Sequence, residues 1–488
     1  MSMLYSQTEI RELEQLAITH GINATELMAR AGGATFALLQ RHYKEAKAIL
    51  ILCGGGNNGG DGYVLAKLAH EAGLNIYVRF VGDLKKLKGE ALNACKACRK
   101  AKINIAPWDS EERLVIDLIV DAMVGIGLKG ELKPEIMQVI EIVNQADIPV
   151  LAIDVPSGLL VDTGDIAGNA IKADSTITFI GIKLGMLTAC GPEYCGALFS
   201  YDLGLPEELF EQVSHSAVAI DLEVFENCFG LRPRSAHKGD FGHVLIVGGA
   251  PGMSGAPLLS ALAAVRVGAG LVSIATHSQH AAFLNINNPE IMCHGVSSKY
   301  ELKDLLAKAS VVVIGPGLGT SDWSKQLFET ALSTNLPLIV DADALNLLSQ
   351  APQKHDNWVL TPHPGEAARL LKVKTKTIQW DRFQAVKNLR KKYHAIVVLK
   401  GSGTVIGSEV EPLVCSGGNP GMASGGMGDL LSGVIAGIVA QGKELSFAAA
   451  LGVCLHATAA DKVALKKGER GLLATDLLPY LTKLINRL

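Results

Sequence analysis

The chain has 488 residues, enough for two or three domains, and carries a net charge of -3 without any basic run. Only 5% of its residues are aromatic, so neither a basic patch nor a stacking surface is expected, and nucleic acid is excluded as a partner. The acidic opening segment and the apolar stretch at 430–440 predict neither a leader nor a membrane partner, because a span needs ~20 apolar residues, and we expect a cytoplasmic protein.

The nine cysteines are scattered, and their odd number and irregular spacing predict free thiols in a reducing compartment. Cys95 and Cys98 form a CxxC pair, but no second pair of this kind follows. A zinc site of this type needs further ligands at a set spacing. We therefore interpret both cysteines as ordinary helix residues.

The first half of the chain alternates short β-branched runs with helical patterns. Two helices are expected within residues 6–40. Strands are expected at 47–53, 75–82, 116–122, 149–155 and 175–181. These runs are apolar almost throughout, which is typical of strands buried on both faces of a parallel sheet that helices cover.

The pattern lapses at 202–240, where prolines and charges interrupt it, and we place a boundary near 220. Strands resume at 243–249, 270–276, 310–315, 337–343, 357–362, 395–400 and 404–407, and helices are expected at 256–268 and 429–442. The sequence therefore predicts two α/β domains in series, at residues 1–220 and 221–488.

Residues 53–62, CGGGNNGGDG, follow one of the expected strands and open a helix. Glycines let a backbone approach a phosphate, and the first N–H groups of a helix bind anions. The spacing matches the GxGxxG dinucleotide pattern, which is weak evidence by itself. Two features argue against an ordinary dinucleotide site. The Asp61 carboxylate would repel a pyrophosphate unless a cation or hydroxyl intervenes, and the glycine pattern recurs at 125–130.

Three strand ends in this half carry hard oxygen donors. They are Asn57, Asn58 and Asp61, then Asp121, then Asp154 and Ser157. Oxygen ligands without cysteine or histidine suit an alkali or alkaline-earth cation. The alternative is that these side chains only cap helices and turns. Their occurrence at three strand ends favours the cation.

A second glycine loop, NPGMASGGMGDLLSG at 419–433, leads into an apolar helix with Asp429 near its first turn. Free N–H groups at such a point can hold a transferring phosphate, and an aspartate beside them can take a proton from an attacking hydroxyl. The alternative is a capping aspartate after a flexible turn.

Several stretches of the first half resemble the NAD(P)H-hydrate epimerase domain. They are NNGGDGYVLAK, DAMVGIGLKGE, AIDVPSGL and FIGIKLGM, with TELMARAGG near the start, and the resemblance covers about residues 5–215. The family implies a Rossmann-like, three-layer αβα sheet. In it the two glycine loops hold the hydrated nicotinamide dinucleotide, with a potassium ion (K⁺) between them.

The resemblance assigns roles residue by residue. The substrate-binding residues would be Asn57, Asn58, Gly59, Gly60, Asp61, Gly125, Ile126, Gly127, Leu128, Lys129, Gly130, Glu131 and Asp154, and the potassium ligands would be Asn58, Asp121 and Ser157. Epimerisation at ring carbon C6 develops positive charge, which a carboxylate stabilises, and Asp154 is our catalytic candidate. Lys183 is either structural or a phosphate ligand.

The second half resembles the ribokinase-like superfamily and, within it, the ADP/ATP-dependent NAD(P)H-hydrate dehydratase, from about residue 225 onward. The residues that carry this resemblance are LKGSGTVI (399–406), IGPGLGTSD (314–322), DADALN (341–346), TPHPGEAARL (361–370) and, most clearly, residues 234–272. A second αβα sheet is implied.

This resemblance also assigns roles. Hydrate contacts would come from Ala256, Gly317, His363 and Asp429, and nucleotide contacts from Lys400, Gly401, Ser402, Gly403, Thr404 and Gly428. Asp429 would activate the C6 hydroxyl for phosphorylation by ADP or ATP, with Mg²⁺ bridging the phosphates. Glu366 is a candidate on the magnesium side. His363 could instead be a packed turn histidine, and His237 and Lys238 are interpreted as a solvated loop.

Together the two resemblances imply an enzyme that repairs hydrated NADH and NADPH. The first domain would interconvert the R and S epimers, and the second would dehydrate the S epimer. Small molecules would be the partners, and we expect a homo-oligomer. Two alternatives remain: a vitamin or sugar kinase with an accessory domain, or a non-catalytic nucleotide-sensing or protein-binding module, at least for the first half of the chain. The choice between ADP and ATP stays open.

Overall fold

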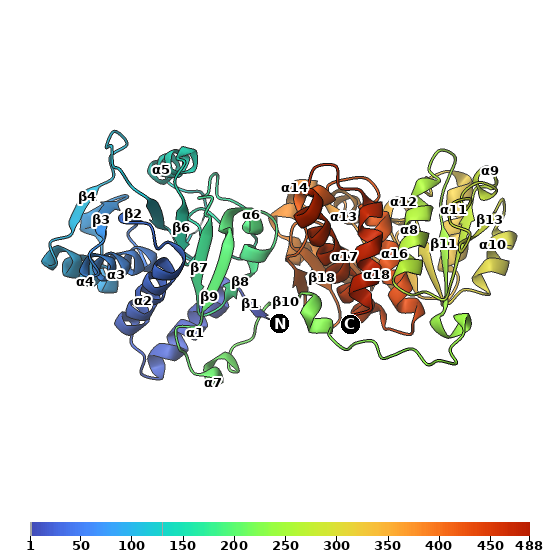
Figure 1. The fold of residues 1–488 in the computed structure, drawn as a ribbon, viewed down its shortest axis with the longest axis horizontal. Helices are drawn as coiled ribbons and strands as arrows, with labels where there is room; N and C mark the ends of the chain where they lie inside the picture. The colour runs from blue at the N-terminus through green and yellow to red at the C-terminus, as the bar shows by residue number, and fades with distance from the viewer. Residues whose placement is uncertain (1, 129) are drawn as a thin grey trace. The chain divides into compact units, whose positions relative to one another are not determined.

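The computed structural model of the protein describes residues 2–128 and 130–488 (Figure 1). It divides into two compact units, Ser2–Ala217 and Val218–Leu488. The division falls close to the boundary expected near 220. Each unit is described by itself below.

The first unit is built on a seven-stranded sheet in which every pairing is parallel, in the order β4-β3-β2-β5-β6-β7-β9. Its strands are β2 (Ala48–Cys53), β3 (Asn75–Phe80), β4 (Asn104–Pro107), β5 (Leu118–Ala122), β6 (Val150–Ile153), β7 (Ser175–Phe179) and β9 (Ala197–Tyr201). Separately, β1 (Ser2–Tyr5) pairs with β8 (Ile182–Lys183). The five strands expected from sequence are confirmed. The edge strands β4 and β9 were missed because they are short and partly exposed.

Helices cover both faces of this sheet. They are α1 (Gln7–Thr19), α2 (Ala24–His42), α3 (Asn57–Glu71), α4 (Gly89–Lys100), α5 (Pro134–Gln145), α6 (Gly191–Cys195) and α7 (Glu207–Phe210), with 3₁₀ turns η1 (Leu84–Lys86) and η2 (Leu184–Leu187). Along β2, Ile49 and Ile51 face the core shared with α1 to α4, whereas Leu50 and Leu52 face the core shared with α5. The unit is therefore a three-layer αβα sandwich, as predicted.

The second unit holds a mixed sheet in the order β13-β12-β11-β14-β15-β16-β17-β18-β19-β10. Its strands are β10 (Ala217–Ala219), β11 (His243–Val247), β12 (Leu271–Thr276), β13 (Met292–Gly295), β14 (Val311–Ile314), β15 (Leu338–Val340), β16 (Trp358–Leu360), β17 (Ile396–Leu399), β18 (Thr404–Gly407) and β19 (Leu413–Cys415). The strands from β13 to β17 run parallel, and β17, β18 and β19 form an antiparallel meander. All seven strands expected from sequence are present.

Helices again cover two faces. They are α8 (Gly255–Arg266), α9 (Ser278–Ala281), α10 (Lys299–Leu306), α11 (Asp322–Leu332), α12 (Ala342–Gln350), α13 (Pro364–Leu371), α14 (Thr375–Trp380), α15 (Arg382–Tyr393), α16 (Met427–Ala440), α17 (Leu445–Lys467) and α18 (Leu478–Ile485), with 3₁₀ turns η3 (Leu222–Phe225), η4 (Lys238–Phe241), η5 (Pro420–Met422) and η6 (Ala474–Leu477). Helix α16 is buried almost all round, which explains its uniformly apolar sequence. Among the described residues one helix, α17, has the length and apolarity of a membrane span, and 72% of that window is buried inside the protein, as in a core helix.

Candidate active sites

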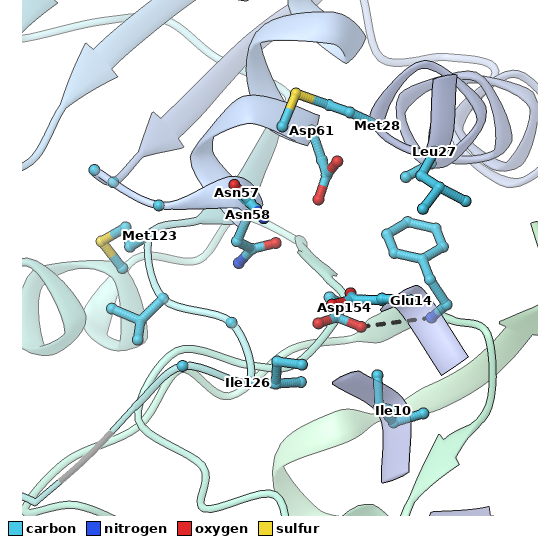
Figure 2. Close-up of a pocket in the computed structure, with 18 of the residues that line it drawn as sticks. Ile10, Glu14, Leu27, Met28, Asn57, Asn58, Asp61, Met123, Ile126 and Asp154 are labelled. Atoms are coloured by element: carbon cyan, nitrogen blue, oxygen red, sulfur yellow. Dashed lines mark hydrogen bonds between the residues drawn. The ribbon is translucent and has the colours of Figure 1, made fainter. Parts of the chain in front are cut away.

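A cavity of about 760 Å³ opens at the carboxyl ends of β2, β5 and β6 in the first unit. In an open parallel sheet this edge is where ligands bind. Polar side chains from different segments converge on it, and Figure 2 shows Asn58, Asp61 and Asp154 directed toward the same space. The sheet therefore brings together residues separated by almost a hundred positions in the sequence.

The glycines of the first loop are required by close backbone packing. A Cβ on Gly54 would lie 1.9 Å from the Met123 carbonyl oxygen, and one on Gly59 would lie 2.2 Å from the carbonyl oxygen of Gly54. Helix α3 starts directly after this loop, and its N-cap, Gly56, has no side chain to cap it. The first N–H groups of α3 are therefore available to an anionic ligand.

Asp154 and Lys183 form a buried ion pair on the floor of the cavity. The Lys183 ammonium is 1% exposed and donates to Asp154 Oδ1 at 2.5 Å, to Thr178 Oγ1 at 2.7 Å and to the Phe179 carbonyl at 3.0 Å. All three of its protons are used within the protein, so in this structure Lys183 holds Asp154 in place. Asp154 has a φ of +65°, a strained backbone conformation of the kind found at functional sites.

Three carboxyl groups, those of Asp61, Asp154 and Glu14, interact with the single Lys183 ammonium. Burial, followed by the charges of Asp154 and Glu14, raises the pKa of Asp61 well above its ordinary value. Burial and then the Asp154 charge also raise the pKa of Glu14. Figure 2 places Glu14, from α1, beside Asp154. These raised pKa values favour the protonated forms of Asp61 and Glu14, so the cluster can offer a proton donor beside Asp154 to a bound ligand. Sequence analysis missed Glu14, since nothing local marks it.

The three expected potassium ligands lie around the second glycine loop. Ser157 Oγ donates to Asp121 Oδ1 at 2.6 Å, and Ser157 Oγ accepts from Val124 N–H at 2.8 Å. Burial raises the pKa of Asp121 to about 6, against the opposing hydrogen bonds from Ser157. Asn58 is buried, and both polar atoms of its amide lack a partner. A Cβ on Gly125 would lie 3.2 Å from Asn58 Cβ, so that loop packs against the asparagine.

This donor set fits a monovalent cation. It offers neutral oxygens with one buried carboxylate, whereas zinc would want sulfur or nitrogen ligands. The unpartnered Asn58 oxygen favours a bound cation, because a buried polar atom without a partner costs free energy. Within residues 2–128 and 130–488, no group of three or more His, Cys, Asp or Glu side chains could hold a metal. Cys95 and Cys98 are free and buried in α4.

The expected substrate residues of the first unit divide into those that line the cavity and those that do not. The residues that line the cavity are Asn57, Asn58, Asp61, Gly125, Ile126, Gly127 and Asp154. Gly59 and Gly60 instead serve packing, since a Cβ on Gly60 would lie 2.3 Å from Met28 Cε. Leu128, Gly130 and Glu131 do not line the cavity, and Lys129 lies outside the described residues.

In the second unit, a charged cluster gathers at the carboxyl ends of β15, β16 and β17. Lys400 Nζ lies 2.8 Å from Asp341 Oδ1 and 4.0 Å from Glu366 Oε2. Burial raises the pKa of Glu366 to about 7, although Lys400 opposes the shift. No role for Asp341 was predicted from sequence, although an acidic side chain directly after a buried strand was a signal for it.

Asp429 sits in the first turn of α16, beside this cluster. A Cβ on the preceding residue, Gly428, would lie 3.1 Å from Lys400 Nζ and 3.7 Å from Asp341 Oδ2. Burial and then the Asp341 charge raise the pKa of Asp429 to about 6, and Lys400 opposes them. A carboxylate with such a pKa is ionised at neutral pH yet basic enough to accept a proton.

His363 is a capping residue. Its Nδ1 accepts a hydrogen bond from Gly365 N–H at 3.0 Å, and its Nε2 lies 3.5 Å from Glu366 Oε1. Burial and then the Lys400 charge lower the pKa of this imidazole, so the ring is neutral at pH 7. The half-exposed His363 ring therefore packs in the turn through Nδ1, and its Nε2 points toward the acidic cluster.

The expected nucleotide segment, residues 400–404, comprises the turn between β17 and β18 and the first residue of β18, Thr404. The Arg382 guanidinium is buried beneath it and donates to the carbonyls of Leu399, Lys400 and Gly403, at 3.0, 3.3 and 3.4 Å. Burial lowers the pKa of Arg382 to about 10. This arginine, which sequence analysis missed, fixes the shape of the turn.

Ala256 and Gly317, two of the expected hydrate contacts, lie next to each other in the second unit. Gly317 has a φ of +56°, and a Cβ there would lie 3.3 Å from Ala256 Cβ and 2.6 Å from the Met253 carbonyl oxygen. Only glycine fits this position. His237 and Lys238, by contrast, lie in an exposed turn.

Comparison with known proteins identifies a family for each half of the chain. Residues 24–185 match the model of the YjeF-related protein N-terminus, and residues 244–483 match the model of NAD(P)H-hydrate dehydratase. A ribokinase-like superfamily protein from Enterococcus faecalis V583 superposes with a TM-score of 0.51 and 30% identity, covering 55% of this chain and 95% of that one.

Two bifunctional NAD(P)H-hydrate repair enzymes are similar along their length. The one from Coxiella burnetii is 49% identical and covers 100% of both chains. The one from Escherichia coli K12 is 42% identical over 96% of this chain and 90% of its own. The chain belongs to the family of bifunctional NAD(P)H-hydrate repair enzymes.

Proposed function

We propose that this protein repairs hydrated NADH and NADPH with one reaction in each unit. The first unit interconverts the R and S epimers of the hydrate. The second dehydrates the S epimer at the expense of ADP or ATP, giving NAD(P)H, AMP or ADP, and phosphate. The observation that carries the proposal is Asp429, a partly buried carboxylate at a glycine-rich helix start beside Lys400.

In the first unit, Asp154 is the residue positioned to act on the nicotinamide ring. Loss and return of the C6 hydroxyl, or ring opening, builds positive charge on the ring, and a fixed carboxylate stabilises that charge. Lys183 prevents Asp154 from rotating away. Asp61 and Glu14, with raised pKa values, exchange the proton that leaves and returns.

Potassium would be held by Asn58, Asp121 and Ser157 in this unit. A bound K⁺ supplies positive charge beside the carboxyl groups, and it thereby lowers the repulsion that a dinucleotide phosphate meets from Asp61. Support comes from the unpartnered Asn58 amide and the buried carboxylate of Asp121.

In the second unit, Asp429 accepts the proton of the C6 hydroxyl as that oxygen attacks the terminal phosphoryl group of ADP or ATP. Phosphate then leaves from C6, and loss of a proton from the neighbouring carbon restores the ring double bond. Residues 400–404 and Gly428 hold the adenine nucleotide. Mg²⁺ would supply charge neutralisation to the nucleotide phosphates when bound, and Glu366, 4.0 Å from Lys400 Nζ, would be a carboxylate on its side of the site.

Absorbance of reduced nicotinamide tests the proposal. Mixed R and S NADH hydrate would be given to the full chain with Mg²⁺, K⁺ and either ADP or ATP. Wild type should regenerate NADH from both epimers, whereas Asp429→Asn should regenerate none. Asp154→Ala should regenerate NADH from the S epimer and from the part of the R epimer that epimerises spontaneously. A stable phosphorylated product without free phosphate would instead show a kinase, and no NADH from wild type would refute the repair reaction.

We further propose a homo-oligomeric protein of the cytoplasm whose partners are the hydrates and ADP or ATP. The nine free cysteines support a reducing compartment.

A further inference from the structure

A second cavity, of about 520 Å³, lies at the carboxyl ends of β3 and β4 in the first unit. Its lining residues are Phe80, Gly82, Asp83, Leu84, Lys85, Arg99 and Pro107. Phe80, Gly82 and Asp83 also line the first cavity, so the two cavities share a wall. A ligand can therefore extend from one into the other.

Sheet order sets the direction in which a dinucleotide lies. β3 and β4 are on one side of β2, and β5 and β6 are on the other (Figure 1). Ligands of such sheets cross the point where the strand order reverses, which here is the loop after β2. Asp154 follows β6, so the reacting nicotinamide lies on the β5–β6 side. The other end of the molecule then lies above β3, in the second cavity.

We propose that the second cavity holds the adenosine end of the hydrated dinucleotide, and that Lys85 and Arg99 bind the 2′-phosphate that distinguishes NADPH hydrate from NADH hydrate. This inference rests on the proposed epimerase function and extends it to substrate selection. Phe80, Leu84 and Pro107 provide apolar walls that suit a purine ring.

Asp83 is placed to recognise the unphosphorylated ribose. Its Oδ1 accepts from Lys85 N–H at 3.0 Å, and its Oδ2 lies 3.9 Å from Lys86 Nζ. An acidic residue at the end of the second strand of such a sheet binds the ribose hydroxyls, and nearby cations accommodate a phosphate. Lys86 offsets the Asp83 charge, so one site accepts both forms of the substrate.

The surrounding charges decide on which side of Asp83 the phosphate lies. Glu135 lines the first cavity, and its Oε1 is 3.7 Å from where a Cβ on Gly82 would be. Glu135 disfavours an anion next to Gly82, although Lys86 and Lys133 also line this cavity. In the second cavity, Asp83 is the single acidic residue of the lining, against the two cations Lys85 and Arg99.

The test is epimerisation measured without ADP or ATP, so that the dehydratase is silent. R and S forms of NADH hydrate and of NADPH hydrate are separated by chromatography after reaction with the full chain. Lys85→Ala/Arg99→Ala should raise KM for NADPH hydrate about tenfold or more with kcat unchanged, and should change KM for NADH hydrate less than about twofold. The exposed pair Lys88→Ala/Lys100→Ala removes the same charge from neighbouring positions that line neither cavity, and it should leave both KM values near those of wild type.

Asp83→Asn tests the same subsite, and it should change the preference between the two hydrates in the opposite direction. The amide can still cap η1, but the negative charge is gone, so preference should move toward NADPH hydrate. Equal losses for both substrates in Lys85→Ala/Arg99→Ala, or no loss for either, would overturn the assignment.

Hydrogen exchange of segment 81–88 separates failure of this inference from failure of the proposed function. If wild type epimerises neither hydrate but NADPH hydrate still protects this segment, and the double substitution removes that protection, the subsite stands and the epimerase function fails. If neither hydrate protects the segment in wild type, the subsite is wrong whatever the activity.

Discussion

Replacing Lys183 by methionine should destabilise the first unit far more than removal of a lysine from an exposed ion pair. Lys183 is 1% exposed, and its partner Asp154 is 15% exposed. The change removes three hydrogen bonds and leaves Asp154 without its cation. Removal of one partner of a buried ion pair costs about 3–5 kcal/mol. For a unit of this size that free energy corresponds to a fall in Tm of about 10 °C.

The matched control is Lys172→Met, in the same unit. The Lys172–Glu193 pair has its closest approach at 2.8 Å, but its side chains are 54% and 64% exposed. Solvent screens such a pair, so the expected cost is below about 1 kcal/mol.

Native-state hydrogen exchange of the amides in β6 and β7 measures the opening free energy of this region in the full chain, without interference from the second unit. A loss below about 1 kcal/mol for Lys183→Met, or equal losses for the two variants, would refute the assignment of Lys183 as the buried anchor of Asp154.

Three further predictions follow from the geometry. The dehydratase rate should fall as pH drops through about 6, because Asp429 must be ionised to accept a proton, and a rate without this acidic limb would contradict that role. Since folding raises the pKa of Asp429, its ionised form destabilises the second unit at pH 7, so Asp429→Asn should raise Tm while abolishing activity, as calorimetry and kinetics can check. Replacing K⁺ by choline should slow epimerisation, and Asn58→Ala should raise the half-saturating K⁺ concentration about tenfold; a rate independent of K⁺ argues against the site. Gly54→Ala should cost about 1–3 kcal/mol and stop epimerisation, because its Cβ would lie 1.9 Å from the Met123 carbonyl oxygen, whereas Gly55→Ala, with nothing within 4 Å, should resemble wild type in both measurements.

Much of the architecture could be predicted from local sequence alone. Strands buried on both faces, such as β2 and β11, are continuous apolar runs, and a parallel sheet is the setting that hides both faces of a strand. Edge strands escaped prediction because one side of each faces solvent or loops, and their composition is mixed. β4 at Asn104–Pro107 and β13 at Met292–Gly295 are examples.

The amino-acid sequence by itself determined where glycines and acidic residues follow strands, and therefore which edge of each sheet is chemically active. The tertiary structure decided which of those groups meet. Glu14 reaches the first cavity from a helix before the first strand of the sheet, and Asp341, Lys400 and Asp429 come together from three separate segments. Strand order and register bring distant chain ends to one place, and burial there sets the pKa values. Neither the strand order nor the burial of a side chain can be read from any short stretch of residues.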